Sequence, residues 1–131
     1  MAYADYIPLQ VRVTAASNTA GLGYATLPTG LSGKYQLVSV DRVSIVAITA
    51  SDTDYRTFTV YGVDKTTAQA SRVTTVAGGS TVAGTPESLA VTGGANAIFE
   101  PGDALYVAGA EAGTGPACDE VFDCLLKKIR G

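Results

Sequence analysis

Residues 6–15 alternate strictly between apolar and polar side chains, and no other feature constrains the fold of this chain as strongly. The odd positions from Ile7 to Ala15 are apolar, whereas positions 10, 12 and 14 hold Gln, Arg and Thr. Because successive side chains of a β-strand point to opposite faces, this pattern predicts a strand with one buried face. Pro8 cannot donate a hydrogen bond to a neighbouring strand, so this end of the strand is expected at a sheet edge or just outside the sheet.

Further apolar runs follow along the chain and are separated by turn residues. They cover residues 22–27, 34–49, 55–63, 70–76, 88–91, 97–99 and 105–107. Only 16% of the 131 residues are charged, and Thr, Ser, Gly and Ala take their place, which favours short strands and turns over helices. We therefore predict one all-β domain over residues 1–131, a single β-sandwich of about eight strands.

The longest apolar segment, residues 34–49, changes phase in its middle. Valines at positions 38 and 40 share one parity, whereas apolar residues at 43, 45 and 47 share the other. A β-bulge at Asp41-Arg42 would place all five on one face, because an extra residue resets the alternation. The alternative is a strand that is buried on both faces.

Residues 118–130 are compatible with two structures. Apolar residues recur at helical spacing from Cys118 to Ile129, with acidic residues first and basic residues last, as a helix dipole favours. Phe122, Cys124 and Leu126 also alternate as in a strand. We favour the strand, because all-β domains often return a terminal strand to cover an exposed edge, and a short C-terminal helix is the alternative.

The segment Glu100–Asp103 predicts a tight turn between two strands. Pro101 fixes φ at the first central position of a β-turn, and Gly102 permits the positive φ that a type II turn needs at the second. Asp103 can accept a hydrogen bond from the backbone beside it. We therefore predict that Pro101, Gly102 and Asp103 form a structural corner that presents no catalytic group.

The sequence predicts no catalytic, cofactor or metal site. The chain has no His, and Cys118 and Cys124 would lie about 20 Å apart on a strand or about 9 Å apart on a helix, too far for a disulfide. Asp52, Asp54 and Asp64 could meet at a calcium site, but the hydrogen bonds that Asp makes within turns explain them more simply. The seven tyrosines are scattered along the chain, which makes carbohydrate binding a minor alternative. We therefore expect a protein that is not an enzyme.

The charge distribution also limits the partners. The net charge is −3, and the only basic cluster lies at residues 127–130, so nucleic acid is not expected as a direct partner. No apolar run approaches the roughly 20 residues of a membrane span, and the N-terminus lacks the basic and apolar segments of a signal peptide. We expect a protein that is made in the cytoplasm and does not bind membranes.

Five segments follow one another in a distinctive order. They are the turn at Leu31–Lys34, a Val-rich strand, the turn at Thr49–Asp54, the letters TFTVYG at Thr57–Gly62, and NAIFEPGDALYV at Asn96–Val107. The last segment contains the pattern F-x-x-G-D-x-L-x-V, which is typical of a turn between two strands. Over residues 30–131 the chain resembles the small decoration (cement) proteins on the heads of tailed bacteriophages. The resemblance implies a jelly-roll-like sandwich.

The same resemblance implies a structural function on the capsid exterior of a virion. Such proteins often trimerise on the outer shell and bridge neighbouring capsid subunits, so we expect a homotrimer whose partner is the major capsid protein. Residues 1–8 are interpreted as an arm or as a frayed terminus, with Tyr3, Tyr6 and Ile7 as candidate contacts. An exposed loop at residues 109–117 is a second candidate contact. The alternative function is a receptor- or glycan-binding module of a head fibre or tail tip.

Overall fold

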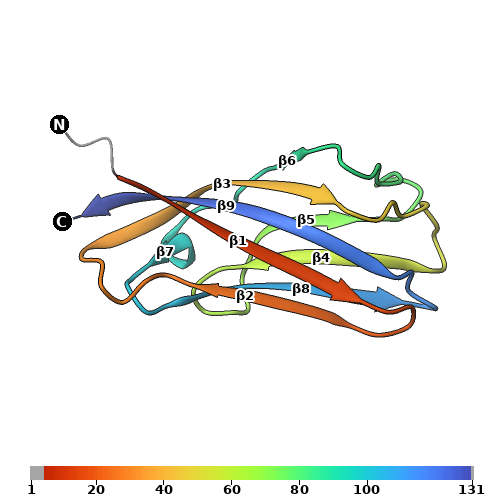
Figure 1. The fold of residues 1–131 in the computed structure, drawn as a ribbon, viewed down its shortest axis with the longest axis horizontal. Coiled ribbons are helices and arrows are strands. Elements are labelled where there is room, and N and C mark those ends of the chain that lie inside the picture. Colours follow the sequence, from red (N-terminus) through yellow and green to blue (C-terminus); the bar gives the residue numbers. More distant parts are fainter. Residues whose placement is uncertain (1–4, 131) are drawn as a thin grey trace.

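Two antiparallel β-sheets pack face to face in this protein (Figure 1). The structure, a computed structural model, describes residues 5–130. Sheet A contains β1 (Tyr6–Ala15), β9 (Cys118–Arg130), β3 (Lys34–Ser44) and β6 (Glu87–Leu89) in this order, and β7 (Ile98–Phe99) also pairs with β3. Sheet B contains β2 (Gly21–Thr26), β8 (Ala104–Ala112), β4 (Tyr55–Tyr61) and β5 (Ala68–Val73) in this order. A short 3-10 turn, η1 (Ala95–Ala97), precedes β7.

The strand order is that of a jelly roll. β6 and β7 both run antiparallel to β3, β6 beside Val40–Arg42 and β7 beside Tyr35–Gln36, so they are two parts of one interrupted strand. With these parts counted together, four strands form each sheet. The chain crosses from one sheet to the other at every connection except β4 to β5 and β6 to β7, which produces the double Greek key of a jelly roll. The prediction of a jelly-roll-like sandwich of about eight strands is confirmed.

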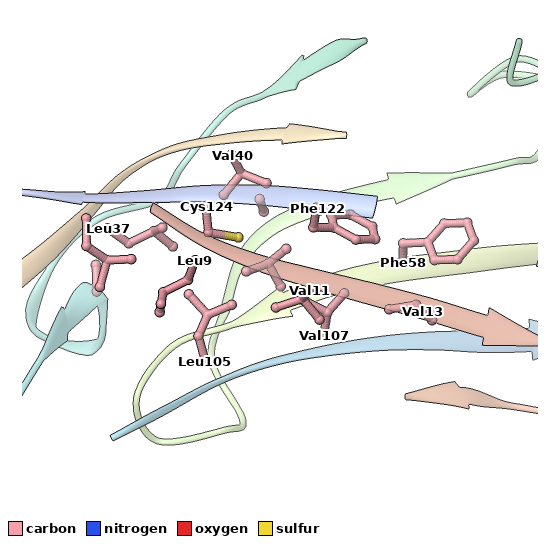
Figure 2. Close-up of a cluster of buried hydrophobic side chains, with 14 of the residues drawn as sticks. Leu9, Val11, Val13, Leu37, Val40, Phe58, Leu105, Val107, Phe122 and Cys124 are labelled. Atoms are coloured by element: carbon pink, nitrogen blue, oxygen red, sulfur yellow. The ribbon is translucent and has the colours of Figure 1, made fainter. Parts of the chain in front are cut away.

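The core lies between the sheets and receives side chains from both of them (Figure 2). Leu9, Val11 and Val13 on β1 are buried, which confirms the alternation that the sequence predicts for this strand. Phe58 on β4 and Phe122 on β9 meet across the sheets, with ring centroids 6.0 Å apart and an interplanar angle of 50°. Burial of each such side chain contributes roughly 1.5–3 kcal/mol, so these contacts stabilise the pairing of the two sheets.

Two glycines allow β2 to lie close to β1 at one side of the sandwich. A Cβ atom at Gly23 would stand 2.5 Å from the carbonyl oxygen of Arg12, and one at Gly21 would stand 2.9 Å from Cγ1 of Val13. Larger residues at these two positions would therefore push the strands apart. β1 is also the edge strand of sheet A, which confirms the position that the sequence predicts for Pro8.

The bulge in β3 lies at Val38 and not at Asp41-Arg42, so the predicted position is wrong. The pairing of β3 with β9 shifts register between Leu37 and Ser39, and Val38 is exposed. After this bulge, Val40, Arg42 and Ser44 point into the sandwich, and the strand ends at residue 44. Arg42 can be buried because the carboxylates of Glu87 and Glu120 neutralise its charge. The alternation of apolar and polar residues in the sequence does not reveal this arrangement.

Residues 118–130 form a strand, and the helical alternative is wrong. β9 pairs with β1 along one edge and with β3 along the other, so it satisfies its backbone hydrogen bonds on both sides. Phe122, Cys124 and Leu126 are buried, in agreement with the alternating pattern. Of the charged residues that suggested a helix dipole, Asp119, Asp123 and Lys127 have the parity that faces away from the core, whereas Glu120 is buried.

The loop predicted from residue 109 begins later, because β8 continues to Ala112. Gly109 pairs with Phe58 on β4, and a Cβ atom there would stand 3.0 Å from the Phe58 ring. The glycine that suggested a flexible loop is therefore a packing requirement of the core. Among residues 5–130, no helix has the length and the apolar character that a membrane crossing requires.

Candidate functional site

The outer face of sheet B carries no charged residue. Strand pairing places its members side by side in rows, because residues that are directly paired share a face of the sheet. We call this surface the tyrosine face. It consists of Leu22, Tyr24, Thr26, Tyr55, Thr57, Thr59, Tyr61, Ala68, Ser71, Val73, Ala104, Tyr106, Ala108, Ala110 and Ala112.

Three tyrosines form a row across this face near one end of its strands, since Tyr61 is the last residue of β4. Tyr24 on β2 pairs with Tyr106 on β8, which pairs in turn with Tyr61 on β4. The rings of Tyr61 and Tyr106 lie against each other, with centroids 5.5 Å apart and an interplanar angle of 30°. Tyr24 is 69% exposed and its neighbour Leu22 is 55% exposed, so the β2 end of the row projects into solvent. Four tyrosines that look scattered in the sequence, Tyr24, Tyr55, Tyr61 and Tyr106, therefore share one surface.

The outer face of sheet A is polar and charged. Arg12 on β1 binds Asp119 on β9 through two hydrogen bonds of 2.8 and 2.6 Å, which hold the pKa of the Asp119 carboxyl below its usual range. Gln10 donates to Asp123, and Asp41 accepts a hydrogen bond from Ser88. The two broad faces of the sandwich thus differ sharply in charge, and a partner could distinguish them.

A shallow hollow of about 190 Å³ lies over β1, β9 and β3 on the outer side of sheet A. It is smaller than the 300–1,000 Å³ that small-molecule sites usually occupy. Its lining brings two carboxylates together but supplies no partner of opposite charge and no nucleophile. The lining residues are Pro8, Ser39, Asp41, Asp123, Cys124 and Leu125.

A chain of ion pairs crosses the interior between the sheets. Arg42 on β3 contacts Glu120 on β9 and Glu87 on β6, the latter at 2.7 Å between Nη2 and Oε1. Glu87 also accepts a hydrogen bond of 2.9 Å from Nε of Arg72 on β5 in the opposite sheet. Arg72 donates further to the carbonyl oxygens of Val73, Gly79 and Ser80. The cluster therefore joins sheet A to sheet B and fixes the segment that follows β5.

The two carboxylates of this cluster have opposite pKa shifts. Hydrogen bonds from Arg72, together with the charge of Arg42, lower the pKa of Glu87 to about 2. Burial raises the pKa of Glu120 above its usual value, even though Arg42 is beside it, because its second carboxylate oxygen lies buried without a partner. All four charges take part in the packing of the sandwich, so we interpret the cluster as structural.

A second buried cation, Arg56 on β4, holds three backbone segments together. Its guanidinium donates to the carbonyl oxygen of Ala16 at 2.9 Å, to that of Gly109 at 3.0 Å and to that of Pro116 at 2.7 Å. These acceptors lie after β1, within β8 and before β9. Arg56 therefore closes one end of the sandwich by bonding to the backbone of all three segments.

The predicted corner at residues 100–103 has the expected geometry. Gly102 has φ of +93°, and the amide of Asp103 donates to the carbonyl of Glu100 at 3.0 Å, as in a type II turn. The Asp103 carboxylate accepts a hydrogen bond from the amide of Glu100 at 2.8 Å. Gly102 and Asp103 also exchange backbone hydrogen bonds with Leu27, so the corner connects β7 in sheet A to β8 in sheet B and anchors the chain that leaves β2.

The predicted partner contacts have different environments. Tyr3 lies outside the described residues. Tyr6 is 47% exposed, and the ammonium group of Lys127 lies 5.9 Å from its ring centroid. Ile7 is half-buried against the core, and of the predicted loop only residues 113–117 lie between strands. The role of these residues as contacts stays a prediction.

The candidate nucleophiles and metal ligands have structural surroundings. Cys118 and Cys124 are free and buried, and burial raises the pKa of Cys124 to about 12, so its thiolate is scarce at neutral pH. Asp64 accepts the backbone N–H groups of Thr66 and Thr67 within its own turn, as the sequence predicts. Asp52 and Asp54 instead accept the N–H groups of Val76 and Thr114, so their carboxylates join segments that are distant in the sequence. In residues 5–130 no three His, Cys, Asp or Glu side chains are grouped as a metal site would require.

The sequence pattern does not predict the tyrosine face, because its rows of residues depend on pairing between strands that are distant in the sequence. Its signal in the sequence is weak: Tyr61 and Tyr106 occupy the polar parity of their strands. No protein-family model, no curated protein and no solved structure matches this chain.

Proposed function

We propose that this protein is a non-enzymatic decoration protein that binds the outer shell of a tailed-phage head and bridges neighbouring major capsid subunits. The observation that carries the proposal is the contrast between the two broad faces of the sandwich. One face is free of charge and bears a row of tyrosines, whereas the other carries charged side chains, among them the Arg12–Asp119 pair. A thin module with such faces can lie on a protein surface and expose its charged side to solvent.

The fold and the resemblance add support of a weaker kind. Jelly rolls are common in viral capsid and lectin domains, although a fold alone does not define a function. The corner at Pro101, Gly102 and Asp103, which belongs to the resemblance, joins the two sheets. With a net charge of −3, the protein suits the outside of a shell, away from packaged DNA. We expect it to act as a homotrimer on the virion.

The stabilising mechanism follows from linkage. A ligand that binds only the assembled shell shifts the equilibrium toward assembly. Each contact with one capsid subunit can be weak, while several contacts made at once are strong through effective concentration. We therefore expect saturable binding to expanded heads and negligible binding to free capsid subunits.

The test is an add-back experiment on heads from which the protein has been stripped or omitted. The purified chain is mixed with bare heads, binding is followed by co-sedimentation, and thermal release of DNA is followed by dye fluorescence. We expect decorated heads to release DNA at a higher temperature than bare heads. If the chain never sediments with shells and the release temperatures are equal, the decoration proposal is wrong.

Glycan or receptor binding is the second candidate, because exposed tyrosines such as Tyr24 are common in sugar sites. Binding to a glycan panel, without any binding to heads, would favour it.

A further inference from the structure

We propose that the tyrosine face is the docking surface of this protein and that its occupant is an uncharged protein surface presented in many copies by the capsid. The inference rests on the proposed function and identifies the part of the molecule that performs it. It also replaces the N-terminal arm and the 113–117 loop as the main contact. The face comprises one whole layer of the sandwich, β2-β8-β4-β5 (Figure 1).

The composition of the face is the first argument. Protein interfaces are distinguished by depletion of charged residues at their centre and by enrichment in aromatic residues, Tyr among them. The tyrosine face has no charged member and four of the seven tyrosines of the chain, Tyr24, Tyr55, Tyr61 and Tyr106. On sheet A the corresponding surface carries charged side chains, among them the Arg12–Asp119 pair and the carboxylates of Asp41 and Asp123, and fits contact with water.

The geometry of the tyrosine row is the second argument, and it favours a protein over a sugar chain. The rings of Tyr61 and Tyr106 are tilted by only 30° and lie 5.5 Å apart, so each covers part of the other's ring face. A sugar that stacks on an aromatic platform needs those faces free. A protein partner can instead use the ring edges and hydroxyl groups, and rings that already support each other lose little conformational entropy on binding.

The size of the face is the third argument, and it selects the kind of partner. Four strands spaced about 4.8 Å apart, with lengths of about 20–30 Å, give a surface of roughly 500 Å². A standard stable interface buries about 800 Å² on each partner. Two copies that met only through this face would therefore associate weakly. A capsid lattice, which presents many copies of one surface, can hold several linked faces at once.

The test compares two matched charge insertions on edge strands. Leu22→Lys adds a cation at the exposed end of the tyrosine face, and Thr14→Lys adds the same charge on the outer side of sheet A. Both side chains are exposed, so we expect both variants to keep the melting temperature and far-UV spectrum of the wild type. Tyr24→Ala is a third variant, which removes the most exposed ring without adding charge.

Binding to bare heads is measured by co-sedimentation over a concentration series. We expect Leu22→Lys to weaken binding by about tenfold or more, Tyr24→Ala to weaken it by several-fold, and Thr14→Lys to bind within about twofold of wild type. If wild type binds and Leu22→Lys binds equally well, the docking surface is wrong while the decoration proposal stands. If wild type does not bind heads, both are wrong. If wild type binds a glycan and Tyr24→Ala abolishes that binding, the face is a sugar site and the protein partner is wrong.

Discussion

Replacement of Arg56 by Met tests how a buried cation contributes to the stability of this sandwich. The guanidinium donates to three carbonyl groups, of which the one on Gly109 is buried and those on Ala16 and Pro116 are partly buried. Met fills a similar volume but donates no hydrogen bond. Loss of the guanidinium therefore leaves the carbonyls of Gly109 and Pro116 without this donor, whereas the carbonyl of Ala16 keeps hydrogen bonds from Thr19.

The magnitude follows from the environment of each carbonyl. The buried acceptor on Gly109 costs about 1–3 kcal/mol when it loses its partner, and the partly buried acceptor on Pro116 costs about 0.5–1 kcal/mol because water can reach it. The sum, about 3 kcal/mol, already allows for the lower desolvation cost of Met. With a urea slope of about 1.5 kcal/mol per molar, the unfolding midpoint should fall by about 2 M.

Urea unfolding followed by circular dichroism is the assay, and Arg12→Met is the matched control. Arg12 forms an ion pair with Asp119, but its side chain is 60% exposed, so its loss should move the unfolding midpoint much less than the loss of Arg56 does. Equal midpoints for the two variants would refute the reasoning, because they would show that the carbonyl groups around Arg56 find other partners at no cost.

Three further predictions concern the corner, the ionic cluster and the thiols. Gly102→Ala should lower the free energy of unfolding by about 1–2 kcal/mol, because Gly102 has a positive φ that strains a residue with a side chain. Gly30→Ala is the control and should change the free energy of unfolding little, because a Cβ atom there would lie in open space. Thermal melting measures both variants. Glu87 has its pKa lowered from an ordinary 4.5 to about 2, so the stability that it contributes is present above pH 4.5 and is lost as the pH falls toward 2. The difference in the free energy of unfolding between wild type and Glu87→Gln, measured by urea titration, should therefore decrease as the pH is lowered. Cys118 and Cys124 should resist a thiol reagent in the native protein and react fully in guanidinium.

Each of these predictions can fail clearly. Equal melting temperatures for the Gly102→Ala and Gly30→Ala proteins would show that the turn tolerates a side chain. A gap between Glu87→Gln and wild type that stays constant from pH 6 to pH 3 would show that the carboxylate has an ordinary pKa in the folded protein. Rapid labelling of native thiols would show that the core opens to solvent.

The sequence was sufficient to predict the fold class because the core depends on period-two alternation. β1 shows that pattern clearly, β9 shows it beside a competing helical spacing, and both are strands with the predicted faces buried. The turn at Pro101-Gly102 was also predictable, since its conformation depends on the two residues themselves. Local chemistry determines both kinds of feature.

The buried cations and the tyrosine face were not predicted, for different reasons. Arg56 has the parity of Phe58, so the alternation does place it inside, but its carbonyl partners come from three distant segments. The rows of tyrosines exist only after β2, β8 and β4 are paired in one register. Pairing between remote strands is set by the packing of the whole sandwich, which a single sequence does not display.

The interruption between β6 and β7 has a consequence for how this protein behaves at high concentration. A long, flat edge strand offers unpaired N–H and C=O groups to other chains and can recruit them into an endless sheet. Here the edge next to β3 is divided into pieces of three and two residues, and the segment between them leaves the plane of the sheet. At the opposite edge of sheet A, Pro8 removes one donor from β1. Both edges of sheet A are thus poor templates for strand addition by other copies of the chain.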